Sequence, residues 1–263
     1  MALPPPSNRS KTSLEATLLY FSKYNYPLIS AELWFWQHQT SFSKLKIDKF
    51  IEHWTLNTEH SKTRKQRELI SQQKWVIARG VGDKLRKIPF VEAIFVTGSL
   101  AMSNCTPNDD VDLMIITSPN TLWLTRLLVY LAIRHFRRKP NVLSAPDKIC
   151  DNLYLDTYHL PLTTHNLYYA HEILQAKCIF DRGGTHRQFL LANPWVKTYL
   201  PVAYRESLRH LSLTNYQLTN QLTILLYPIN LLLFWLQYLY MLPKMTTERV
   251  SLGSAFFHPA SKA

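Results

Sequence analysis

The sequence predicts an α/β fold of the mixed α+β kind, with a small sheet between two helical segments. Two short runs rich in β-branched and aromatic residues, 93–97 and 111–117, are bounded by turn-forming residues, which is typical of buried strands. Apolar residues at helical spacing precede and follow these runs. A chain of 263 residues that is 46% hydrophobic and has only 6 glycines is expected to be folded, largely helical and divided into two or three units.

The first sixty residues predict a disordered tail and a helical module. Residues 1–11 are rich in Pro and Ser, which is typical of a disordered terminus. The region 12–60 carries three helical patterns and a short strand, beginning near Thr12, Ser30, Ser43 and Trp54. This order predicts a winged-helix-like module. Such a module either contacts nucleic acid through its third helix or serves as a docking unit without a ligand. The exposed cations of that helix are expected to be Lys44, Lys46 and Lys49.

A basic helix is expected to join this module to the first strand. Residues 60–88 hold nine Lys or Arg against two acidic residues, and apolar residues at helical spacing lie in their second half. The cations either remain solvated or contact the phosphate backbone of a nucleic acid. The formal net charge of the chain, +12, also favours an anionic partner, such as nucleic acid, a nucleotide or an acidic membrane surface.

Polar residues cluster around the two predicted strands. Gly98 and Ser99 follow the first strand, where a glycine lets the backbone approach a bulky ligand and the N–H groups of a helix start can seat an anion. Asp110 and Asp112 lie at the start of the second strand, two residues apart, so both project from one face of the sheet. Paired carboxylates at a strand end suit Mg²⁺, which bridges substrate phosphates. The combination predicts phosphoryl or nucleotidyl transfer.

This arrangement resembles the nucleotidyltransferase fold of the DNA polymerase beta superfamily, and in particular its minimal nucleotidyltransferase domains. The shared pattern is an apolar strand, Gly98-Ser99, and then Asp110-Val111-Asp112 inside a second strand. The resemblance covers roughly residues 83–160 and implies a nucleotidyltransferase domain over 61–160, including the basic helix. More loosely, the whole chain resembles bacterial proteins that carry this domain between two helical segments.

The resemblance implies a Mg²⁺- or Mn²⁺-dependent enzyme that moves a nucleoside monophosphate from an NTP to a hydroxyl group. Asp110 and Asp112 would then be catalytic and bind the metal ion, and Gly98 and Ser99 would bind the nucleotide. Some relatives carry an Arg directly after Gly-Ser, whereas Leu-Ala-Met stands there in this chain. Arg126 is therefore a candidate for the contact with the triphosphate. The interpretation requires the glycine turn and three carboxylates to meet at one edge of the sheet, with the Ser99 hydroxyl close to the carboxylates of Asp110 and Asp112.

The superfamily carries a third carboxylate on the next strand. A buried helix over 121–136 is expected to cross over to this strand at 148–156. Asp151 is the preferred third catalytic and metal-binding residue, because apolar residues at alternate positions continue its face of the strand. Asp156 is an alternative. If the strand phase differs by one residue, Asn152 takes the position and the third acid is missing.

Residues 161–263 predict a C-terminal helical region with an apolar segment at 222–242. Its 21 uncharged residues reach the length of a bilayer span. Three polar residues recur every seven positions, which places a polar stripe along one side: Thr223, Asn230 and Gln237. The segment is therefore either a packed helix or a membrane-associated helix that leaves residues 1–210 in the cytoplasm.

A cytoplasmic location is expected in either case. The three cysteines stand far apart without a Cys-x-x-Cys pair, which disfavours a zinc site and suits a reducing compartment. The N-terminal residues lack the apolar region of a secretory signal.

Three functions are consistent with the sequence. The first is a nucleotidyltransferase whose acceptor is a protein, an RNA or a small molecule. The second is a non-catalytic protein that binds nucleic acid through the N-terminal module and the basic helix 60–88. The third is a membrane-associated protein that uses 222–242.

Overall fold

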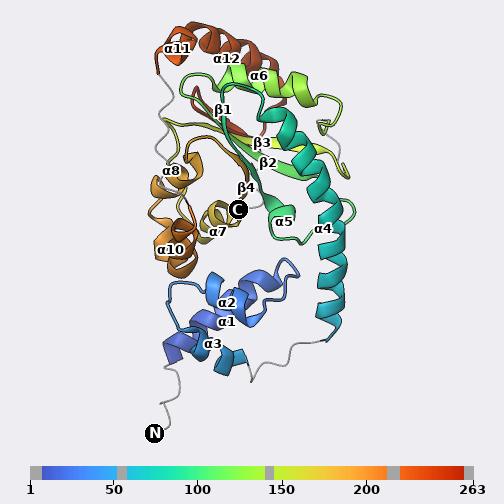
Figure 1. Cartoon of the computed structure of the whole chain (residues 1–263), viewed down its shortest axis with the longest axis vertical. Coiled ribbons are helices and arrows are strands. Elements are labelled where there is room, and N and C mark those ends of the chain that lie inside the picture. The colour runs from blue at the N-terminus through green and yellow to red at the C-terminus, as the bar shows by residue number, and fades with distance from the viewer. Residues whose placement is uncertain (1–7, 52–57, 140–144, 212–219, 258–263) are drawn as a thin grey trace.

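The computed structural model contains a six-stranded mixed sheet in the order β4-β1-β2-β3-β6-β5 (Figure 1). The structure describes residues 8–51, 58–139, 145–211 and 220–257. The strands are β1 (Val91–Val96), β2 (Val111–Thr117), β3 (Ile149–Asp156), β4 (Lys177–Asp181), β5 (Arg249–Val250) and β6 (Ser254–Phe256). Strands β2 and β3 are parallel, whereas the other neighbouring strands are antiparallel. The predicted mixed α/β class is confirmed.

Helices cover both faces of the sheet (Figure 1). They are α1 (Asn8–Ser22), α2 (Ser30–Trp36), α3 (Lys44–Ile51), α4 (Thr58–Leu85), α5 (Gly98–Ala101), α6 (Leu122–Ile133), α7 (Leu167–Gln175), α8 (Thr185–Leu191), α9 (Val196–Tyr199), α10 (Pro201–Arg209), α11 (Asn220–Leu225) and α12 (Tyr227–Met241). We call the face covered by α4, α6 and α12 the crossover face, and the face covered by α7–α10, against which α1–α3 pack, the module face.

The alternation of side chains along the central strands explains the two layers. Phe95 of β1 and Met114 of β2 are buried on the module face, whereas Ile94 and Leu113 are buried on the crossover face. Because β1 and β2 are covered on both sides, their sequences are nearly continuous apolar runs. This burial makes both strands recognisable from sequence.

The N-terminal helices share one apolar core with the sheet and the C-terminal helices. Leu33 of α2 and Ile47 of α3 belong to the same buried cluster as Phe95 and Phe189 of α8. Helix α1 begins at Asn8, so residues 8–11, which were expected to be part of a disordered tail, are helical instead. The expected strand of the winged-helix-like module, at 54–56, lies outside the described residues.

The C-terminal region contributes strands as well as helices, which differs from the helical region expected over 161–263. Strand β4 pairs with β1 at one side of the central strands, and β6 pairs with β3 at the other. In the part of the chain that the structure describes, no helix combines the length and apolar character needed to cross a membrane. The apolar segment 222–242 is divided at Leu226, two residues before Pro228, into α11 and α12.

Candidate functional site

The turn after β1 lies against the start of β2. The antiparallel pairing of these strands brings Val96 opposite Leu113, and the Thr97 N–H donates to the Asp112 carbonyl oxygen at 3.0 Å. Gly98 has φ +63°, a left-handed conformation that costs little only for glycine. A Cβ atom on Gly98 would lie 2.5 Å from Asp112 Oδ2. Both the backbone conformation and the contact with Asp112 therefore require glycine.

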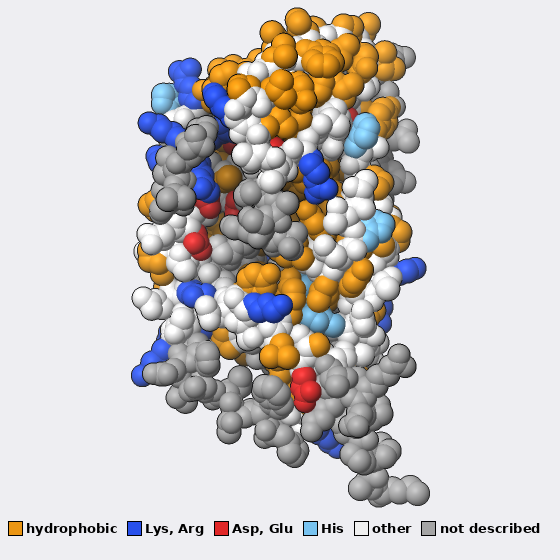
Figure 2. All heavy atoms as spheres, turned by 180° about the vertical axis from the view of Figure 1, so that it is seen from behind, with side chains coloured by type: hydrophobic (Ala, Val, Ile, Leu, Met, Phe, Trp, Pro, Cys, Tyr) orange, Lys and Arg blue, Asp and Glu red, His pale blue; other side chains and the backbone are white. Residues whose placement is uncertain are grey.

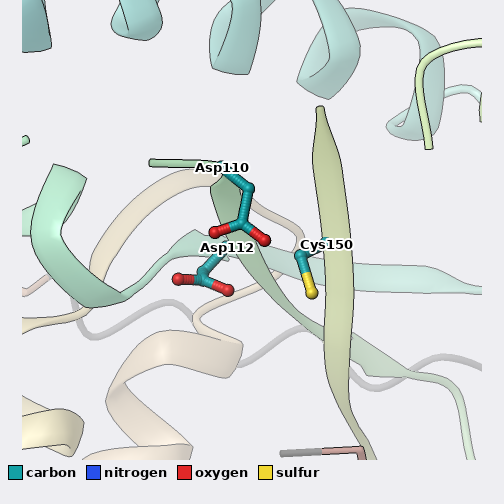
Figure 3. Close-up of side chains that lie close together, drawn as sticks. All are labelled: Asp110, Asp112 and Cys150. Carbon is teal, nitrogen blue, oxygen red and sulfur yellow. The ribbon is translucent and has the colours of Figure 1, made fainter. Parts of the chain in front are cut away.

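Two carboxylates and a thiol lie together at this edge of the sheet (Figure 3). Asp110 and Asp112 come from the start of β2, and Cys150 comes from β3, where the parallel pairing places it beside Asp112. One ligand atom of each residue lies within 4.8 Å of the others, and all three side chains are half-buried. Asp110 and Asp112 thus point into one common space, as the sequence predicts for two residues spaced two apart on a strand.

Neighbouring polar groups orient both carboxylates. Arg138 Nη1 forms an ion pair with Asp110 Oδ2 at 2.7 Å, and Asn152 Nδ2 donates to Asp112 Oδ1 at 2.6 Å. Burial lowers the pKa of the Arg138 guanidinium, but Asp110 outweighs burial, so the net pKa lies above the ordinary value. Burial, followed by the two nearby carboxylates, raises the pKa of the Cys150 thiol far above its usual range. Cys150 is therefore a neutral thiol at physiological pH.

The loop between α5 and β2 is held by Ser99 and by a buried lysine. Ser99 Oγ donates to Asp109 Oδ2 at 2.9 Å, so the hydroxyl lies one residue away from the paired carboxylates and orients their loop. Lys74 of α4 donates to the Asp109 carbonyl oxygen and to Asp147 Oδ1, both at 2.7 Å. Lys74 thus joins the loop before β2 to the loop before β3, and its side chain is almost fully buried.

The sequence contained a signal for Lys74 that the analysis of the basic helix missed. Lys74 stands four and seven residues before the buried Ala78 and Val81. This spacing places its side chain on the apolar stripe of α4 and not on the solvated face. A lysine on such a stripe must find buried acceptors, because burying an unpaired charge is costly.

Asp151 does not lie beside Asp110 and Asp112. The expectation that it supplies the third carboxylate of this group is therefore corrected. Asp151 is buried on the crossover face, where it pairs with Arg137 and accepts a hydrogen bond from the Tyr154 hydroxyl at 2.9 Å. The cause is a bulge in β3. Leu113 pairs with Asp151 but Met114 pairs with Leu153, so Asn152 is an extra residue in the strand. Before the bulge, side chains therefore point to the opposite face from the one that regular alternation with Leu153 would give. Cys150 and Asn152, instead of Asp151, face Asp112.

The two other candidates also lie elsewhere. Asp156 is buried at the far end of β3, where His159 Nδ1 lies 2.6 Å from its Oδ1. Arg126 of α6 is half-buried on the crossover face, where it donates a hydrogen bond to Gln237 and lies 4.5 Å from the centre of the Phe257 ring. Burial lowers its pKa. The expected triphosphate contact by Arg126 is therefore wrong in its geometry, because the sheet separates Arg126 from Asp112.

Several cations of the basic helix are engaged within the molecule. Arg64 pairs with Glu32 of α2 at 2.6 Å, and Arg67 donates to Asn104 Oδ1 at 2.9 Å. Lys62 and Lys65 are exposed. The contact of α4 with nucleic acid stays a prediction, and it would use exposed cations such as Lys62 and Lys65 rather than Arg64 and Arg67.

Comparisons with known proteins do not assign the chain to a family. No protein-family model matches the sequence, and neither the curated proteins nor the solved structures that were searched contain a match. The candidate site is thus defined by its own geometry: the Gly98 turn, the carboxylates of Asp110 and Asp112, and the cation of Arg138 beside them.

Proposed function

We propose that the chain is a Mg²⁺- or Mn²⁺-dependent nucleotidyltransferase that moves a nucleoside monophosphate from an NTP to a hydroxyl acceptor. The observation that carries this proposal is the direct contact between the Gly98 turn and Asp112, with Asp110 beside it. A turn that favours glycine, packed against paired carboxylates, lets a bulky phosphorylated ligand approach a metal-binding group. The resemblance of the motif to nucleotidyltransferases points to the same chemistry.

The donor atoms fit a hard divalent cation in part. Asp110 and Asp112 supply carboxylate oxygens, which Mg²⁺ prefers. Cys150 fits less well, because sulfur suits softer metals than Mg²⁺. Two carboxylates suffice where substrate phosphates and water complete the coordination of Mg²⁺. When bound, the ion would bridge the phosphates and neutralise charge on the transferred group.

The remaining residues position these groups. Asn152 fixes one oxygen of Asp112, and Lys74 and Ser99 hold the loop that leads into β2. Arg138 places a guanidinium beside Asp110, where its planar set of donors can recognise phosphate oxygens. In this proposal Arg138 takes the role of triphosphate contact that the sequence assigned to Arg126.

A second candidate is a protein that binds a nucleotide without transferring it. The position of Asp151 favours this alternative, because among the described residues the ligand group contains two carboxylates and a thiol instead of three carboxylates. Without a third carboxylate, deprotonation of the acceptor hydroxyl has no general base within the group. A nucleic-acid-binding role through the exposed lysines of α4 would be independent of both candidates.

A transfer assay separates the two candidates. Purified full-length protein is incubated with Mg²⁺ or Mn²⁺ and each α-labelled NTP in turn, and label is sought on the protein, on co-purified RNA and on small molecules. We expect Asp112→Asn to lower transfer at least about 100-fold, since loss of a metal ligand should exceed the effect of losing its supporting partners. Asp83→Asn, at an exposed aspartate of α4, is the matched control.

The outcomes are distinct. NTP binding that depends on Asp112 without any transfer would support the second candidate. A protein that binds no NTP in the presence of either metal ion would contradict both.

We also infer a cytoplasmic location. Cys105, Cys150 and Cys178 are all free thiols, which suits a reducing compartment where NTPs are available.

A further inference from the structure

The segment formed by α11 and α12 exposes an unusually apolar surface. Half of the exposed large hydrophobic side chains among the described residues lie between 222 and 242, each between 41% and 75% exposed. They are Leu222, Ile224, Leu225, Tyr227, Ile229, Leu232, Trp235, Leu236, Leu239, Tyr240 and Leu242. In Figure 2 this surface forms a continuous apolar cap at the end of the molecule that carries α11 and α12. We call these eleven residues the apolar cap.

The polar residues of the same segment face the protein. Thr223 and Asn230 are buried, and Asn230 Oδ1 accepts hydrogen bonds from the backbone N–H groups of Trp123 and Leu124 at 2.8 and 3.2 Å. Gln237 Nε2 donates to the Trp123 carbonyl oxygen at 2.9 Å. A surface helix normally turns its apolar side inward and its polar side to water. Here the inner side of α12 combines these polar contacts with the packing of Leu233 and Phe234 on the core, and the outer side is apolar as well.

Cations lie beside the apolar cap. Lys244 stands 3.9 Å from the centre of the Tyr240 ring, and Lys84 stands 4.2 Å from that of Phe136, at the end of the neighbouring α6. Arg134, also at the end of α6, is exposed. In sequence, the stretches 113–146 and 207–247, which contain α6, α11 and α12, include no Asp or Glu. The acids nearest to these cations lie outside those stretches: Asp83, which pairs with Arg86 on α4, and Glu248, which accepts from Thr246 N. The apolar surface thus has a margin with more cations than acids.

We propose that the apolar cap lies on a membrane surface that contains anionic lipids, with α12 parallel to the plane of the bilayer. An apolar helix face together with aromatic residues and flanking cations is the combination that binds the interface between headgroups and acyl chains. Helix α12 has 15 residues and is about 22 Å long, shorter than the roughly 30 Å of a bilayer core. Its polar side is already bonded to α6, so only one face is available to lipid.

Charge favours lipid over a second copy of the chain as the occupant. A two-fold contact brings the same surface patch of each copy together. The sequence stretches that form this patch contain cations and no acids, so self-association would leave Arg134, Lys244 and their equivalents without anionic partners. Anionic headgroups would supply those partners, at about 1 kcal/mol for each cation near the surface.

Vesicle co-sedimentation of the full-length protein tests the proposal. The vesicles contain phosphatidylcholine alone or a mixture with phosphatidylglycerol. We expect binding to the mixed vesicles at low salt and at least tenfold weaker partitioning for the triple variant Leu232→Ser/Leu236→Ser/Leu239→Ser. The control Leu45→Ser/Leu69→Ser/Val76→Ser changes equally exposed residues on other helices and should bind like the wild type.

A second pair of variants tests the contribution of charge. Arg134→Gln/Lys244→Gln should weaken binding to the mixed vesicles about tenfold, whereas Lys62→Gln/Lys65→Gln, with the same change in net charge, should have little effect. The proposal is overturned if the wild type does not sediment with mixed vesicles, or if both triple variants bind equally. Sedimentation velocity identifies the alternative occupant. If the wild type does not bind vesicles but forms a dimer that the Leu232→Ser/Leu236→Ser/Leu239→Ser variant cannot form, the apolar cap is a dimer interface and the proposal is overturned.

Discussion

Two consecutive arginines show how differently the two faces of the sheet use charge. Arg137 pairs with Asp151 on the crossover face, where the carboxylate is almost fully buried and also bonded to the Tyr154 hydroxyl. Arg138 pairs with Asp110 on the module face, where both side chains remain partly exposed. The first pair is closed to ligands and contributes to folding, whereas the second is partly open to solvent. Both arginines pair with an aspartate, so the burial of each pair and its further hydrogen bonds decide whether it stabilises the fold or stays accessible.

The largest expected difference concerns stability. Asp151→Asn should lower the free energy of unfolding by about 3–5 kcal/mol, because it leaves the partly buried Arg137 without its anionic partner. Asp112→Asn should change the same quantity by less than about 1 kcal/mol, because the side chain is half-buried and can still accept a hydrogen bond from Asn152. Urea denaturation measures both. Equal destabilisation by the two variants would show that the faces do not differ in this way.

Acid should weaken the module face through a buried histidine pair. His38 Nε2 lies 3.0 Å from His171 Nε2 between α1, α2 and α7. Burial lowers the pKa of His38 to about 4, and burial and His38 lower that of His171. The unfolded chain therefore binds more protons between pH 6.5 and pH 4, so stability is full above about pH 6.5 and falls as the pH drops toward 4. His38 alone contributes about 3 kcal/mol to this loss.

Urea denaturation at pH 7.5, 5.5 and 4.5 measures this dependence. His38→Gln retains a hydrogen-bonding side chain without a titrating group, so its loss of stability on acidification should be smaller than that of the wild type by about 3 kcal/mol. If wild type and variant lose the same free energy over this range, the histidine pair is not the acid-sensitive element of the module face.

The smallest of the three effects concerns Gly98. Gly98→Ala should destabilise the protein by about 1–2 kcal/mol, since alanine disfavours φ +63°, and it should also displace the Asp112 carboxylate that its Cβ would meet. We therefore expect a small change in melting temperature together with a large loss of NTP binding. Gly80→Ala on α4 is the control, because an added Cβ there meets nothing within 4 Å and should stabilise the helix. Unchanged NTP binding by Gly98→Ala would separate the turn from the site.

Much of the central sheet was predictable because its strands are buried on both sides. The second strand was expected at 111–117 and β2 is Val111–Thr117, while the first and third strands differ by only one or two residues at their ends. The pattern of apolar runs contains the strand positions directly. The meeting of the Gly98 turn with Asp112, which the family resemblance requires, results from the antiparallel pairing of β1 with β2.

The errors come from features that a local pattern does not contain. A strand with regular alternation would place Asp151 with Leu153, but the extra residue Asn152 reverses the phase. Strand β4 was missed because five residues between two helices show no distinctive pattern, and its pairing with the distant β1 determines its conformation. For Arg126, the sequence showed a cation on an apolar helix but not which face of the sheet that helix covers.

The bond from Asn230 to the first turn of α6 has a consequence for the order in which the protein is made. Thr121 precedes α6 without a capping side-chain hydrogen bond, and Asn230 accepts from Trp123 N, 107 residues earlier in the chain. At ordinary rates of translation those residues take roughly 5 to 20 seconds to synthesise. A nascent chain on the ribosome therefore holds α6 without its cap, while β1, β2 and the carboxylates of Asp110 and Asp112 have already emerged. The crossover layer can be completed only after Asn230 has been synthesised.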